Sequence, residues 1–186
     1  MTRDELEHII RASGEITNQY EFVIIGSQSM LGPVSSPEEV FLVSMEADIY
    51  PLLAPELADK IDGVIGEGSQ FHQTHGYYAQ GVGPDTATLP KDWMQRVHRV
   101  QNCNTNDRVG YCLGVLDLFL AKAVAGREKD REFCMALFEY SYVTPAQVLE
   151  LVPTMPVDDK AQRMLRATIR RWAKFVRDAG HNVPEE

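Results

Sequence analysis

The stretch that most constrains the fold is an apolar run that ends at a glycine and is followed by two alternating acids. Residues 22–25 (FVII) are apolar and rich in β-branched side chains, which is typical of a strand buried on both faces. Gly26 and Ser27 end this run, and Glu46 and Asp48 lie in the next apolar segment. Side chains two positions apart on a strand project to the same face, so we expect both carboxylates to point the same way.

This pair of acids indicates a site for a divalent cation. Two carboxylates on one face repel each other and are unfavourable near a core unless a positive charge lies between them. Mg²⁺, or Mn²⁺ in its place, binds one or two carboxylates together with substrate phosphate oxygens. Glu46 and Asp48 are therefore candidate metal ligands and catalytic residues, and Gly26 and Ser27 are candidates for binding the phosphates. The alternative is a solvent-facing edge strand on which the two acids bind nothing.

The order of strand, Gly-Ser turn, short segment and acid-bearing strand resembles the nucleotidyltransferase fold over residues 23–49. The resemblance implies an α+β (α/β-like) protein, with a small mixed sheet flanked by helices and a helical C-terminal part. Members of that superfamily commonly carry a third acid on a later strand. The corresponding segment here has Gln80 in that place. A single-metal site and an inactive site therefore both remain open.

A second block, DLFLAKAVAGREKDREFCMALFE, resembles a motif of the AbiEii-type branch, which is associated with toxin–antitoxin and phage-defence systems. The match carries over Asp117, Lys122, Arg127, Lys129 and Asp130. It implies that Lys122 and Asp130 are catalytic and that Asp117 and Arg127 bind the nucleotide. Chemically, a lysine and an arginine near metal-bound carboxylates can neutralise charge on a departing pyrophosphate. The alternative is an ordinary helix pair with surface ion pairs of little energetic value. Lys122 fits this alternative least, because it lies within a strongly apolar helix.

Periodicity divides the chain into a mixed first part and a helical second part. In the first part we expect helices at residues 3–12 and 55–65, and strands at residues 21–26, 41–51, 71–82, 96–100 and 109–113. In the second part we expect helices at residues 115–125, 127–139, 145–151 and 157–179. The predicted domains are an α/β core over residues 1–113 and a helical region over residues 114–186.

Charge is distributed unevenly along the chain. The net charge of −9 argues against a protein that coats nucleic acid without specificity. Seven of the 18 basic residues nevertheless fall in the last predicted helix: Lys160, Arg163, Arg166, Arg170, Arg171, Lys174 and Arg177. This basic helix is either a solvated face or a docking surface for an RNA backbone or an acidic partner.

The remaining composition favours a cytoplasmic protein. The three cysteines are an odd number without the spacing of a zinc site, which favours a reducing compartment. No apolar run reaches the length of a membrane span, and the first residues do not resemble a signal peptide. We therefore expect no membrane association.

These patterns together predict a magnesium-dependent nucleotidyltransferase. It would move a nucleotidyl group from an NTP to a hydroxyl of RNA, with tRNA as one candidate acceptor, or of a protein. The resemblance places this activity in a toxin–antitoxin or defence system. The alternative is a catalytically inactive protein of the same fold that senses a nucleotide or binds a partner.

Overall fold

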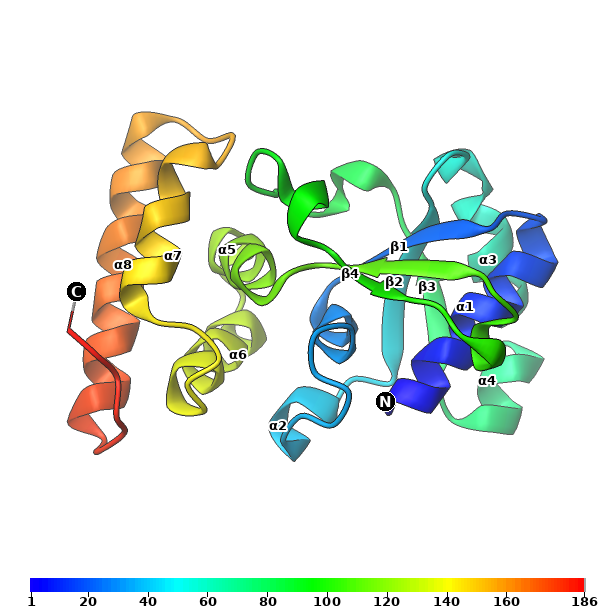
Figure 1. The fold of residues 1–186 in the computed structure, drawn as a ribbon, viewed down its shortest axis with the longest axis horizontal. Helices are drawn as coiled ribbons and strands as arrows, with labels where there is room; N and C mark the ends of the chain where they lie inside the picture. The colour runs from blue at the N-terminus through cyan, green and yellow to red at the C-terminus, as the bar shows by residue number, and fades with distance from the viewer. Residues whose placement is uncertain (186) are drawn as a thin grey trace. The chain divides into compact units, whose positions relative to one another are not determined.

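The computed structural model describes residues 1–185 and contains one mixed β-sheet and a series of helices (Figure 1). The strands of the sheet are β1 (Glu21–Ile25), β2 (Glu46–Pro51), β3 (Tyr78–Gly81), β4 (His98–Val100) and β5 (Val109–Cys112). Among them in the sequence lie α1 (Arg3–Thr17), the 3-10 helix η1 (Ser27–Leu31), α2 (Glu39–Leu42), α3 (Ala58–Ile65) and α4 (Gln70–His75). After them come α5 (Val115–Ala125), α6 (Glu128–Glu139), α7 (Pro145–Leu151) and α8 (Asp159–Asp178). The α+β class predicted from the sequence is confirmed.

The strand order in the sheet is β3-β2-β1-β5-β4. Strand β1 is central, and it pairs antiparallel with β2 and parallel with β5. Strand β2 pairs parallel with β3, and β4 pairs antiparallel with β5 as a hairpin. Because β1 has a neighbour on each side and packing on each face, residues 22–25 are all buried, as the apolar run predicts.

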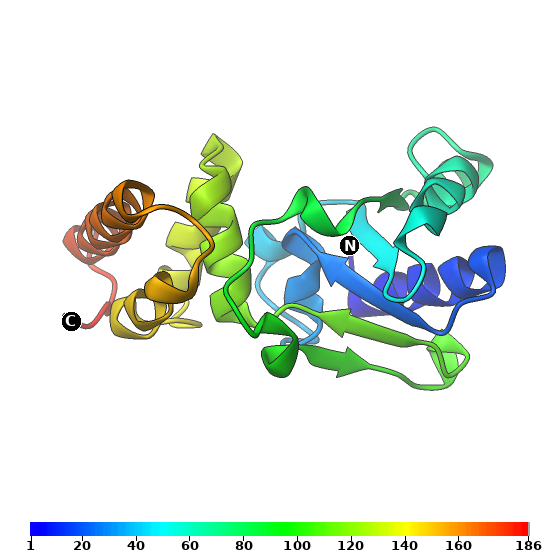
Figure 2. The same cartoon turned by 90° about the horizontal axis from the view of Figure 1, so that it is seen from above.

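Helices α1 and α3 cover one face of this sheet (Figure 2). The core on that face contains Leu6, Ile9 and Ile10 of α1, Ile61 and Ile65 of α3, and Phe22, Ile24, Ala47, Ile49 and Ala79 of the strands. Side chains alternate along a strand. The positions between these core residues, which include Glu46 and Asp48, therefore belong to the opposite face.

Helix α1 is longer than its periodicity predicts. It begins with a capping box, in which the Thr2 hydroxyl accepts from the Glu5 amide and the Glu5 carboxylate accepts from the Thr2 amide. The predicted end at residue 12 is wrong, because the helix continues to Thr17, and Asn18 caps it in the left-handed conformation. A Cβ at Gly14 would overlap the side chain of Arg108, which would have to shift to make room for it.

Two predicted strands are corrected by the structure. The segment after Phe41 is not a continuous strand, since residues 39–42 form α2 and β2 begins only at Glu46. The expected strand at 71–82 is also wrong in its first half. Ser69 caps α4 by accepting from the His72 amide, and Gly76 ends that helix with a φ of 80°. Local capping therefore outweighs the strand preference of the aromatic residues.

The chain separates into two compact units, and each is described by itself. The sheet unit comprises Met1–Thr86 and Arg96–Gly114, and the helical unit comprises Ala87–Gln95 and the chain from Val115 onward. The predicted domain division at residue 113 stays a prediction, because compactness does not show which part folds alone. None of the described helices combines the length and apolar character that crossing a membrane requires.

The helical unit is built from two pairs of consecutive helices. Helices α5 and α6 pack on each other, and α7 and α8 do the same, with α8 also packing on α6. The ring of Phe119 contacts those of Phe138 and Trp172, with centroids 4.9 and 6.3 Å apart. Helix α7 begins at Pro145, as predicted, and Thr144 and Gln147 form a capping box at its start. This unit accounts for the helical C-terminal part expected from the sequence.

Candidate active site

The turn after β1 requires glycine for two reasons. Gly26 has a φ of 68°, a conformation that other residues adopt only with strain. A Cβ at this position would also overlap Oδ2 of Asp48. Ser27 follows as the first residue of η1, and Gly26 supplies the carbonyl that accepts from both the amide and the hydroxyl of Ser29. The Asp48 carboxylate therefore lies directly against the backbone of the turn.

Strand β2 presents the two acids on one face, as their spacing predicts. Glu46 and Asp48 are half-buried, whereas Ala47 and Ile49, which alternate with them along the strand, are fully buried. The register places Asp48 beside Ile25, the residue that precedes Gly26. The pleat thus brings the carboxylate pair to the end of β1 where the turn begins. The structure joins Gly26, Glu46 and Asp48 in one corner of the sheet unit.

Strand β3 adds a tyrosine and a glutamine to the same face. Tyr78 lies beside Glu46 and Gln80 beside Asp48 in the parallel pairing of β2 and β3. The Tyr78 hydroxyl donates to Oε2 of Glu46 at 3.0 Å. Burial, together with the hydrogen bond and charge of Glu46, raises the pKa of Tyr78 to about 12. The phenol therefore stays protonated at neutral pH and remains a donor to Glu46.

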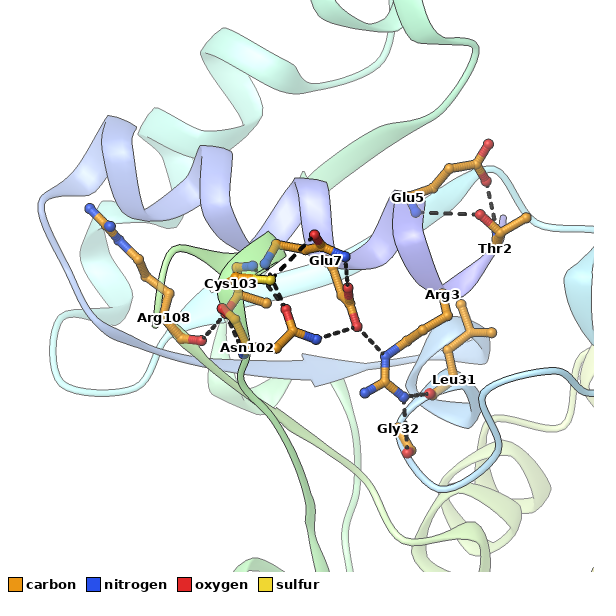
Figure 3. A network of polar contacts seen from close by, with 11 residues as sticks. Thr2, Arg3, Glu5, Glu7, Leu31, Gly32, Asn102, Cys103 and Arg108 are labelled. Atoms are coloured by element: carbon orange, nitrogen blue, oxygen red, sulfur yellow. Dashed lines mark hydrogen bonds and ion pairs between the residues drawn. The ribbon is translucent and has the colours of Figure 1, made fainter.

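Arg3 of α1 holds the far end of η1. Its guanidinium donates to the carbonyls of Leu31 and Gly32 at 2.6 and 3.3 Å, and to Oε1 of Glu7 at 2.9 Å. Figure 3 shows Arg3, Glu7 and Asn102 pointing toward one another. Helix α1 thereby fastens the segment that begins at the Gly-Ser turn.

Glu7 is the buried centre of this network. Its side chain is almost fully covered, and it accepts hydrogen bonds from the amides of Asn102 and Asn104, both at 2.9 Å, and from Arg3. Burial alone would raise the pKa of Glu7, but the hydrogen bonds from the two asparagines and Arg3 lower it overall. Glu7 therefore remains ionised at neutral pH.

This lowered pKa predicts that the sheet unit loses stability in acid. A carboxyl whose pKa is lower in the folded than in the unfolded state stabilises the fold above its ordinary value of 4.5, and this stabilisation is lost as pH falls through the lower folded value. Glu7→Gln should cost roughly 1–3 kcal/mol at pH 7 and should flatten the dependence of melting temperature on pH. Circular-dichroism melts between pH 7 and 3 measure this. An equally steep dependence in Glu7→Gln would contradict the assignment.

In the helical unit, Lys122, Arg127 and Asp130 form a cluster. Asp130 is fully buried, and its carboxylate accepts from the Lys122 ammonium at 3.1 Å and from Nε of Arg127 at 2.6 Å. The ammonium also lies 4.4 Å from the ring centroid of Phe133, a cation–π contact. Burial alone would raise the pKa of Asp130, but the hydrogen bonds and charges of Arg127 and Lys122 lower it overall.

The structure thus gathers the predicted site residues into two groups. Gly26, Ser27, Glu46 and Asp48 lie in the sheet unit, and Asp117, Lys122, Arg127 and Asp130 lie in the helical unit. Asp117 is fully buried in the first turn of α5. The surface ion-pair alternative does not describe Lys122 and Asp130, since their side chains are only 7% and 0% exposed. That the two groups act together in one reaction is a proposal.

Comparison with known families gives one match. The model of a family described as "nucleotidyltransferase of unknown function (DUF6036)" matches residues 4–176. The chain belongs to this family. No curated protein and no solved structure matches the chain. The superfamily inferred from the strand, turn and acid pair is thereby supported, and the matched range includes the sheet and most of α8.

In the described strands β2 and β3 of this nucleotidyltransferase-family protein, the acids on this face are Glu46 and Asp48. Gln80 occupies the register position beside Asp48, as the sequence predicts. Within residues 1–185, no group of three or more His, Cys, Asp and Glu side chains is placed to hold a metal ion. The two oxygen donors beside a turn with no room for a Cβ fit a Mg²⁺ ion that arrives with substrate phosphates, since that ion needs only one or two carboxylates.

Two residues that contact this corner or the adjoining η1 segment are absent from the residues selected by sequence. Tyr78 was hidden by the incorrect strand at 71–82, although its spacing from Gln80 would place both on one face of a strand starting at residue 78. Arg3 had no sequence signal, because its partners Leu31 and Gly32 are backbone groups. His72 and His75 lie on α4, where His72 stacks on Tyr78 with centroids 4.6 Å apart.

The turn geometry predicts a specific sensitivity to substitution at Gly26. Gly26→Ala should destabilise the sheet unit by about 1–3 kcal/mol, because a left-handed φ is unfavourable for alanine and the new methyl must displace Asp48. Nucleotide binding should weaken with it. Circular-dichroism melts measure the stability. Gly83→Ala is the matched control, since a Cβ there meets no atom within 4 Å. Equal behaviour of the two variants would show that Asp48 moves freely.

Proposed function

We propose that this protein transfers a nucleotidyl group from an NTP to a hydroxyl of RNA or of a protein. The observation that carries the proposal is the placement of Glu46 and Asp48 on one face of β2, with Asp48 against the backbone of Gly26. Family membership supports the same reaction class. In the reaction, the hydroxyl oxygen bonds to the α-phosphorus, the bond from that phosphorus to pyrophosphate breaks, and the hydroxyl proton passes to water.

Each group of residues has a role in this proposal. Glu46 and Asp48 would hold Mg²⁺ or Mn²⁺, which when bound supplies charge neutralisation to the phosphates. The turn at Gly26 and Ser27 would bind the β- and γ-phosphates through backbone N–H groups and the Ser27 hydroxyl. Tyr78 orients the Glu46 carboxylate by its hydrogen bond.

The helical unit is proposed to contribute the cations of the reaction. Lys122 and Arg127 would stabilise negative charge on the leaving pyrophosphate. Asp130 orients both of them through the contacts of the buried cluster, and Asp117 is proposed to take part in nucleotide binding. The order of these residues supports an AbiEii-like branch with a role in a toxin–antitoxin or defence system and tRNA as a candidate acceptor. The free thiols of Cys103, Cys112 and Cys134 support a cytoplasmic location.

A second function is favoured by one observation. Gln80, not an acid, lies beside Asp48 in the sheet. An amide cannot replace a carboxylate in neutralising a second metal ion. The second candidate is therefore a nucleotide sensor of the same fold that binds an NTP without transferring it.

Nucleotide binding tests both functions. Titration calorimetry of the full chain with ATP, GTP, CTP and UTP, with and without Mg²⁺, should show binding that requires Mg²⁺ for at least one nucleotide. Radiolabelled NTP mixed with total RNA or protein should then label an acceptor if the protein is a transferase. Binding without labelling would favour the sensor. Absence of binding to all four nucleotides in the presence of Mg²⁺ would overturn both.

A further inference from the structure

The helical unit contains a hollow between α6 and α8, and apart from Arg127 its lining residues have no part in the proposed reaction. Its volume is about 740 Å³, within the range of small-molecule sites. One stripe of α6 faces it, with Arg127 and Arg131 one helical turn apart. The facing stripe of α8 contributes Thr168, Arg171 and Phe175. All the residues that line it belong to the helical unit.

The lining of this hollow is basic in an acidic protein. Three arginines line it, and Glu128 is the acidic side chain among the lining residues. The chain as a whole has a net charge of −9. Arg131 and Arg171 are exposed, and the guanidinium of Arg171 makes a long contact with the Thr168 hydroxyl, at 3.5 Å, on its own helix. Arginine forks match the geometry of phosphate oxygens, so the charge of the hollow is complementary to phosphate.

An exposed aromatic ring lies beside these arginines. Phe175 is 57% exposed, although phenylalanine is normally buried, and Trp172 lines the hollow while remaining 6% exposed. Nucleic-acid bases stack on such rings regardless of sequence, each stack contributing about 1–3 kcal/mol. A carboxylate-rich peptide would satisfy the arginines but would leave the ring without a planar partner. Cations and an exposed ring together favour a strand with both phosphates and bases.

We propose that this hollow binds single-stranded nucleic acid, with phosphates on Arg131 and Arg171 and a base stacked on Phe175. Binding of the strand does not require the metal site proposed at Glu46 and Asp48. That the bound strand is RNA acting as the acceptor rests on the proposed function. Of the seven basic residues of α8, Arg171 is the one that lines the hollow. The proposal therefore assigns strand binding to Arg171 rather than to the whole basic helix.

Fluorescence anisotropy with labelled 12-nucleotide strands of RNA and of DNA tests the proposal on the full chain. Arg131→Ala with Arg171→Ala should weaken binding by about tenfold for each arginine. The slope of log affinity against log salt should also shrink by about 0.7 for each arginine. The matched control is Lys160→Ala with Arg163→Ala, which removes the same charge from exposed positions of α8 outside the hollow. The control should change affinity by less than about threefold.

A second variant tests the stacking part without altering charge. Phe175→Leu should weaken binding by about tenfold and leave the salt slope unchanged. Met164→Leu, at an exposed apolar position of α8 outside the hollow, is its control and should bind as wild type. Helix content by circular dichroism should be the same for all variants, because every substituted side chain is exposed.

Three results would overturn the proposal. The first is that the wild-type protein does not bind the strand. The second is that the arginine pair and its control reduce strand binding equally. The third is that polyglutamate displaces the strand at equal charge concentration. Asp48→Asn separates this proposal from the proposed function. This variant should bind the strand as wild type does. If it loses nucleotide transfer but still binds the strand, the result supports the hollow as a strand-binding site. Preference for RNA over DNA would identify the natural strand.

Discussion

Asp48→Asn is expected to abolish magnesium-dependent nucleotide binding while leaving the sheet unit folded. Asparagine preserves the shape of the side chain against Gly26 but removes one of the two negative charges that β2 presents on this face. Even partners in the outer shell of a metal site change affinity by about 10–100-fold. Loss of Asp48 as the proposed direct ligand should therefore weaken binding of the Mg²⁺–NTP complex by at least about 100-fold. Calorimetry with the nucleotide that binds wild type measures this.

Asp59→Asn is the matched control for this prediction. Asp59 is an exposed carboxylate in the first turn of α3, in the same unit. Its replacement removes the same charge and should change nucleotide affinity by less than about threefold. Glu46→Gln should resemble Asp48→Asn. Binding that survives both Glu46→Gln and Asp48→Asn would show that these acids are an unliganded strand face, and the proposed metal site would be abandoned.

Asp130→Ala should produce the largest loss of stability. It leaves the Lys122 ammonium buried in an apolar helix without its carboxylate, and removing one partner of a buried ion pair typically costs about 3–5 kcal/mol. Both tryptophans of the chain, Trp93 and Trp172, lie in the helical unit. Tryptophan fluorescence during urea unfolding therefore reports the stability of this unit directly.

Two further variants show whether the buried charge causes this loss. Lys122→Met with Asp130→Leu removes both charges and should recover most of the lost stability, since apolar replacements of a buried pair are often neutral. Asp178→Asn breaks the exposed pair of Lys174 and Asp178, whose side chains are 70% and 61% exposed. It should cost less than about 1 kcal/mol. A loss in Asp130→Ala no larger than that in Asp178→Asn would contradict the role assigned to the buried cluster.

Several features were predictable because their causes are local in the sequence. The apolar residues 22–25 predict a central strand, and two-residue spacing predicts that Glu46 and Asp48 share a face. The Thr-Pro pair predicts the start of α7. Other features were not predictable in this way. The aromatic segment 71–82 has strand propensity, but the Ser69 cap and the Gly76 stop make its first half a helix.

The sequence by itself determined the class of this protein and the residues that could carry its chemistry, because periodicity, turn residues and charge in an apolar helix are properties of short segments. Only the tertiary structure decided which groups meet. The pairing of β2 with β3 brings Tyr78 to Glu46 and Gln80 to Asp48. The packing of α6 on α8 sets Arg131 and Arg171 around one hollow. Such meetings depend on strand register and helix packing between segments far apart in sequence, and no local pattern specifies them.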